Sequence, residues 1–141
     1  MLQFSPPDHP ARICATQSTA RDVLADYAFS LPGVRPARRI GGKPLDLALS
    51  DADALGSSDA FFHGTVFGRF RSDHQTGIDL MLPARPWSDA IRVGLARPIA
   101  GVAPRDSGMA APVLVRSPRD PVEMHVVMEL IESSWAYARG L

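Results

Sequence analysis

The residues best suited to acid–base chemistry lie in one stretch of the chain, residues 63–82. It holds two of the four histidines, His63 and His74, together with the carboxylate of Asp79. An imidazole titrates near neutral pH, so either histidine can accept a proton when a carboxylate orients it. The stretch therefore predicts catalytic groups at His63, His74 and Asp79.

Three arginines offer a second chemistry, the binding of an anion. Arg69 and Arg71 lie in the same stretch, and Arg97 follows it. A guanidinium presents a planar fork of donors that fits a carboxylate or an enol oxygen, but at neutral pH it cannot act as a general base. The arginines predict a clamp for an acidic ligand; the alternative is that they are ordinary surface arginines.

Side-chain alternation predicts that residues 63–82 form a two-stranded hairpin with a turn at residues 72–76. The apolar face is expected to carry Phe62, Val66, Phe70, Ile78, Leu80 and Leu82, and the polar face His63, Thr65, Phe67, Arg69, Arg71, Asp79 and Met81. Apolar residues must oppose one another, so Arg69 is expected opposite Asp79 as a charge pair of roughly 0.2–1 kcal/mol. Either this face binds a ligand, or the pair is only a solvated one.

Charge and cysteine content exclude several classes of protein. Fifteen basic and fifteen acidic residues cancel, so the overall field that nucleic-acid or anionic-membrane binding relies on is absent. A single cysteine, Cys14, excludes an intrachain disulfide and a multi-cysteine metal site. No spacing of histidine and carboxylate matches a zinc or non-haem iron pattern, so we expect neither metal nor cofactor.

The start of the chain and its apolar runs bear on location. No run approaches the roughly 18 apolar residues that span a bilayer, and residues 1–15 lack a basic segment followed by an apolar one. We therefore expect no membrane association and a cytoplasmic protein.

The elements around the hairpin predict its support. A proline-containing arm is expected at residues 1–15 and one domain at residues 16–141. Helices are expected at residues 16–30, 86–93 and 120–139, short strands at 34–40, 44–49 and 112–116, and loops at 50–59 and 96–111. The last helix has the strongest pattern: Asp120 can cap it, Pro121 suits its first position, and Met128 and Ile131 lie on its apolar stripe. This order predicts an α+β fold, an antiparallel meander with helices packed on one face and a long C-terminal helix.

Several short segments carry a family resemblance over about residues 31–139. They are Leu31-Pro32-Gly33-Val34, Phe67-Gly68-Arg69-Phe70-Arg71-Ser72-Asp73, Asp106-Ser107-Gly108 and Ser133-Ser134-Trp135-Ala136-Tyr137-Ala138. In order and spacing they resemble the luciferase-like domain family, which includes small bacterial proteins and the catalytic region of the fungal luciferases that oxidise 3-hydroxyhispidin. The arrangement is also similar to MmcQ/YjbR-type α+β domains.

The resemblance implies a small-molecule site on the hairpin and an oxygenase chemistry that relies on histidines. Family members carry a His-x-His pair where this chain has Arg69-Phe70-Arg71, and a further histidine at Arg97. His74 matches a histidine of the fungal enzymes, and Asp79 replaces another. These replacements favour charge recognition over proton transfer.

Two classes of function stay open from the sequence. In the first, the domain binds an acidic or polyketide-like metabolite and acts on it without a cofactor. In the second, it is a non-catalytic module for protein interaction, as a homodimer or with another partner. A pocket ringed by the arginines favours the first class, and a flat, filled sheet face favours the second.

Overall fold

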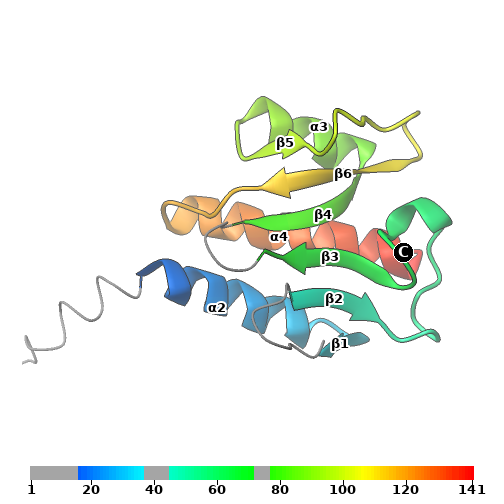
Figure 1. Ribbon diagram of the computed structural model, residues 1–141, viewed down its shortest axis with the longest axis horizontal. Helices are drawn as coiled ribbons and strands as arrows, with labels where there is room; N and C mark the ends of the chain where they lie inside the picture. Colours follow the sequence, from blue (N-terminus) through cyan, green and yellow to red (C-terminus); the bar gives the residue numbers. More distant parts are fainter. Residues whose placement is uncertain (1–15, 37–44, 72–76) are drawn as a thin grey trace, which may run out of the picture.

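The structure is a computed structural model that describes residues 16–36, 45–71 and 77–141. Two predictions fall outside these residues, the arm at residues 1–15 and the hairpin turn with His74, as does the end of the strand expected at residues 34–40. Within the described residues the chain forms an antiparallel sheet and helices, the α+β fold that the sequence predicts (Figure 1).

The sheet contains six strands in the order β1-β2-β3-β4-β6-β5, and every neighbouring pair is antiparallel. The strands are β1 (Val34–Pro36), β2 (Leu45–Leu49), β3 (Val66–Phe70), β4 (Ile78–Pro83), β5 (Ala96–Pro98) and β6 (Ala110–Val115). The first four form the predicted meander. β5 was expected to be loop because Pro98 and Gly101 interrupt the pattern; that prediction is wrong, since the short strand lies along β6 at the sheet edge.

In the part of the chain that the structure describes, three α-helices and one turn of 3-10 helix accompany the sheet. They are α2 (Thr16–Ser30), α3 (Ala84–Arg92), α4 (Pro121–Arg139) and η2 (Ser58–Ala60). α4 starts as predicted: the Asp120 side chain accepts a hydrogen bond from the Glu123 amide at 2.8 Å, and Pro121 occupies the first turn. It ends at Gly140, whose left-handed φ of 80° suits glycine.

One face of the sheet is the hydrophobic core, and all three α-helices contribute to it. Figure 1 shows α4 running behind the sheet, across β3 and β4. The helices add Leu24, Ala28, Ala90, Val127, Leu130, Ile131 and Ala138 to a cluster that the strands supply with Leu47, Leu49, Phe70, Ile78, Leu80, Leu82, Val113 and Val115. Ile131 is fully buried, as the stripe predicts. The prediction that helices cover one face is confirmed.

A β-bulge corrects the predicted faces of β3. Leu47 lies opposite Gly68, but the next pair is Ala48 with Val66, so Phe67 is an extra residue. Side-chain alternation along β2 puts Ala48 on the face away from the core. Val66, which lies opposite Ala48, is therefore on that face too. Phe67 instead joins the core cluster with no exposed surface. The prediction of a polar-face Phe67 is therefore wrong, because regular alternation cannot foresee an inserted residue. Val66 is buried as predicted, although it lies outside the core cluster.

A buried serine fixes α4 at this bulge. Pairing between β3 and β4 ends at Gly68 and Leu80, so the next two residues, Phe67 and Met81, have carbonyls beyond the ladder. The Ser134 hydroxyl, fully buried, lies 2.7 Å from the Met81 carbonyl oxygen and 3.3 Å from that of Phe67. It supplies the donor that the interrupted pairing lacks.

None of the helices within the described residues combines the length and the apolar character needed to cross a bilayer.

Candidate functional site

The second face of the sheet carries a row of mostly charged residues that runs from β2 to the edge strand β5. Cross-strand pairing places Asp46 opposite Arg69, Arg69 opposite Asp79, and Asp79 opposite Leu114. Leu114 lies opposite Arg97 on the edge strand. Because residues directly opposite each other share a face, this row brings together predicted site residues from three strands. We call this face the helix-free face, since the α-helices contribute to the core cluster on the other side.

The ion pairs in this row differ from the predicted one. Arg69 lies opposite Asp79 as predicted, but its Nε donates to Asp46 Oδ1 at 3.0 Å. Asp79 Oδ1 instead accepts from Arg71 Nε at 2.9 Å. The predicted Arg69–Asp79 ion pair is therefore wrong in partner although right in register. Asp46, on the far side of Arg69, competes for the guanidinium, and Arg71 reaches Asp79 diagonally.

Asp79 is the least exposed charged group of the row, with a side chain 12% exposed against 29% for Arg71. A carboxylate with so little water depends on its cation for solvation. Its contact with Arg71 thus fits a group anchored within the sheet better than one that approaches a substrate.

His63 lies at the margin of this face. Its Nε2 is 3.4 Å from Arg69 Nη2, and the residue is exposed. A short β-bridge between His63 and Val66 holds the backbone there. The imidazole therefore neighbours the Arg69–Asp46 pair rather than Asp79. His74, the other predicted catalytic histidine, lies outside the described residues.

Arg71 and Arg97 line the same surface hollow, of about 320 Å³, together with Pro98, Ile99, Ala100 and Leu114. Arg71 lies across from Gly77, and its backbone N–H donates a hydrogen bond to the Gly77 carbonyl at 3.1 Å. Gly77 has a φ of 117° and a Cβ there would come 2.6 Å from the Val115 carbonyl oxygen. Only glycine fits, because β6 passes so close to the backbone here.

Arg97 is the exposed cation of this hollow. Among the residues that the structure describes, its guanidinium takes part in no ion pair, whereas Arg71 is paired with Asp79. An arriving anion would therefore meet an uncompensated positive charge at Arg97. Two of the three arginines predicted to bind a ligand, Arg71 and Arg97, are thus brought together, and Arg69 is held by Asp46 one strand away.

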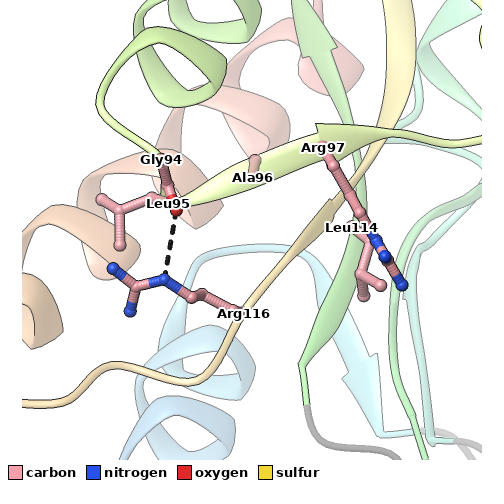
Figure 2. A pocket seen from close by; sticks show the side chains of 6 residues that line it. All are labelled: Gly94, Leu95, Ala96, Arg97, Leu114 and Arg116. Carbon is pink, nitrogen blue, oxygen red and sulfur yellow. Dashed lines mark hydrogen bonds between the residues drawn. The ribbon is translucent and has the colours of Figure 1, made fainter.

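A second hollow, of about 330 Å³, adjoins the first along β5 and β6 and shares Arg97 and Leu114 with it (Figure 2). Its other residues are Gly94, Leu95, Ala96 and Arg116. Figure 2 shows the side chains of Arg97 and Leu114 extending together, while Arg116 turns toward Gly94. Neither Arg116 nor Leu114 was predicted as a site residue, because the strand β5 that lies beside them was not expected.

Arg116 is held by a carboxylate from the start of α4. Its Nη1 and Nη2 donate to the two Glu123 oxygens at 2.8 and 2.9 Å, and its Nε donates to the Gly94 carbonyl at 3.1 Å. Glu123 also accepts from the Arg119 amide at 2.8 Å. The Arg116 hydrogen bonds, followed by the one from Arg119, lower the pKa of Glu123 from 4.5 to about 2. The second hollow therefore carries a neutralised pair.

A polar cluster that the sequence did not indicate lies at the other end of the sheet. Asp59 accepts from the Tyr137 hydroxyl at 2.7 Å, from the Ser57 hydroxyl at 2.7 Å and from the Ala110 amide at 2.6 Å. Burial alone would raise the pKa of Asp59, but these hydrogen bonds outweigh it and lower the pKa. Because every partner is satisfied within the fold, the cluster ties α4 to the start of β6, and we assign it a structural role.

Within residues 16–36, 45–71 and 77–141 there is no group of three histidine, cysteine or acidic side chains placed to hold a metal ion. No protein family, curated protein or solved structure matches the chain.

Proposed function

We propose that this protein binds a small acidic metabolite on its helix-free face, as a small-molecule-binding domain of the luciferase-like family. The observation that carries the proposal is that Arg71, which follows β3, and Arg97, in β5, line one hollow of about 320 Å³. Arg97 supplies the uncompensated charge, and Leu114 and Ile99 supply apolar contact beside it. Such a combination suits an organic anion better than a bare inorganic one.

Binding is better supported than catalysis. Asp79 is anchored by Arg71, and His63 neighbours Arg69 at the margin of the face. Neither lies among the residues that line the hollow. A guanidinium fixes an anion but does not accept protons. The resemblance to the luciferase-like family, with arginines at its histidine positions, supports the same choice.

The sheet edges argue against a partner that adds a strand. β1 and β5 are three residues long, and each ends in a proline, Pro36 and Pro98. Leu95 and Ile99 bond to β6, so alternation points the backbone of Pro98 outward, where it has no N–H to offer. A homodimer or other protein partner would need a different surface. A cytoplasmic location stays a prediction, which the single cysteine supports.

Titration of the full chain with benzoate, followed by backbone amide shifts in nitrogen-15 NMR, tests the proposal. We expect shifts centred on Arg97, Ile99 and Ala100. Arg97→Gln should weaken benzoate binding by about tenfold or more, since a charge-assisted hydrogen bond contributes about 1.5–3 kcal/mol.

Arg85→Gln is the matched control, because Arg85 is an exposed arginine on α3 and the substitution removes the same charge. It should bind benzoate as the parent does. Equal weakening of benzoate binding in the two variants would show that only the net charge of the protein matters. An absence of amide shifts at Ile99 and Ala100 would reject the site.

A further inference from the structure

We infer that the two hollows form one binding site with a charged and a neutral compartment, so that its ligand is a monoanion with an apolar body and not a dianion. This inference rests on the proposed function and adds the ligand class.

The register makes the two hollows continuous. The Arg116 amide donates to the Leu95 carbonyl at 2.9 Å, so Leu95 and Arg116 form the cross-strand pair next but one to Arg97 and Leu114. Side chains two residues apart in a strand lie on the same face. The intervening Ala96 points to the core, with which it packs. The second hollow therefore lies between the Leu95–Arg116 pair and the Arg97–Leu114 pair. Arg97 and Leu114 also line the first hollow, so they form the wall between the two.

The compartments differ in charge. Around Arg97 the positive charge is uncompensated within the described part of the chain. Around Arg116 it is cancelled by Glu123, which accepts through both oxygens at 2.8 and 2.9 Å. A second carboxylate placed there would lose water without gaining a net cation, and it would approach the Glu123 carboxylate. An uncharged group meets no such opposition.

The second compartment also offers apolar surface. Leu114 forms one wall of it, and Gly94, Leu95 and Ala96 belong to its lining, although the Leu95 side chain is itself buried. The Arg116 Nε is occupied by the Gly94 carbonyl. An aryl or alkyl group can therefore lie against Leu114 while the carboxylate remains at Arg97.

Two probes that share a carboxylate and a chain of three methylene groups separate the monoanion from the dianion: 4-phenylbutyrate and glutarate, each titrated into the full chain by nitrogen-15 NMR. We expect 4-phenylbutyrate to shift the amides of Ala100 and of Gly94 and Ala96, and to bind about tenfold more tightly than glutarate, a ratio of the size that burying a few methylene groups gives. Acetate, which lacks a body, should shift only the amides around Arg97.

A charge variant sharpens the test. Glu123→Gln removes the charge that cancels Arg116, so glutarate should gain about fivefold in affinity, the size of a partly screened ion pair, while 4-phenylbutyrate stays unchanged. Glu129→Gln removes the same charge from the exposed face of α4, where Glu129 lies beside His125, and should change neither affinity.

The outcomes separate the two proposals. Shifts at Ala100 with none at Gly94 and Ala96, or glutarate binding as tightly as 4-phenylbutyrate to the unmodified chain, would overturn the two-compartment site and leave the anion site standing. If neither these probes nor acetate shifts the amides around Arg97, the proposed function fails with it. The comparison of probes on the unmodified chain does not depend on Glu123→Gln being folded.

Discussion

The two faces of the sheet are built from the same strands, one residue out of phase, and they differ in what decides their contacts. Leu47, Leu80 and Val113 form a row that is fully buried under the helices. The residues next to them, Asp46, Asp79 and Leu114, form the row that crosses the helix-free face. On the first face any well-fitting apolar neighbour stabilises the fold, whereas on the second each charge needs a particular partner. Stability is therefore concentrated on one face, and the ligand site that we propose lies on the other.

The largest effect expected on this comparison comes from the core face. Ile131→Ala should lower the free energy of unfolding by about 2–5 kcal/mol, because the side chain is fully buried and its removal leaves a cavity. Val122→Ala, at an exposed position of the same helix, should change it by less than about 0.5 kcal/mol. Urea unfolding of both variants provides the measurement. Similar losses would show that burial on α4 does not govern stability.

The next effect compares two ion pairs of the helix-free face. Arg71→Ala should cost about 1–3 kcal/mol, since it leaves the nearly buried Asp79 carboxylate without its cation. Arg69→Ala should cost about 0–1 kcal/mol, because the Asp46 side chain is 30% exposed and water can replace the guanidinium. Urea unfolding of the two variants ranks them. An Arg69→Ala loss equal to that of Arg71→Ala would contradict the order of burial.

The same contrast explains what the sequence could predict. Alternation and helix periodicity depend only on neighbours along the chain, so the core face, the covering helices and the register of Arg69 with Asp79 could be predicted. The partner of Arg69 could not, because Asp46 belongs to a strand whose position across the sheet is set by the whole fold. Its place in the alternating segment Leu45-Asp46-Leu47-Ala48-Leu49 was the available signal, a charge on the outward side of a strand.

Two local features could not be predicted from the sequence, for a different reason. The bulge at Phe67 and the short strand β5 both break the regular pattern that prediction relies on. β5 contains Arg97, so missing it meant that Arg97 was proposed for the site without the geometry that joins it to Leu114. Prediction was thus strongest where burial repeats along an element, and weakest where one inserted or edge residue sets the contact.

A smaller effect is expected where the two faces meet at the bulge. Ser134→Ala should cost about 0.5–1.5 kcal/mol, since the hydroxyl that donates to the Met81 carbonyl at 2.7 Å is lost. Ser133→Ala is the control: it removes the same hydroxyl oxygen from the neighbouring, half-buried serine and should change the free energy of unfolding little. Hydrogen exchange of the Phe67 and Gly68 amides gives a local readout, because loosening of the bulge should speed it. Unchanged exchange together with unchanged stability would remove Ser134 as the fixing residue.

The smallest effect concerns Glu123, at the border between the helix layer and the helix-free face. Hydrogen bonds from Arg116 lower its pKa from 4.5 to about 2, so the folded protein binds this proton more weakly than the unfolded chain does. The stabilisation is therefore complete above about pH 4.5 and is lost as the pH falls toward 2. Thermal unfolding measured between pH 6 and 2 should show a shallower decline for Glu123→Gln than for the parent. Asp59, whose pKa is also lowered, keeps part of the decline in both proteins. Glu129→Gln, which leaves the Arg116 contact intact, should decline as the parent does. If Glu123→Gln follows the parent curve throughout, Glu123 is not stabilised as a carboxylate by Arg116. The second hollow would then lack the neutralised arginine that distinguishes it from the hollow around Arg71 and Arg97.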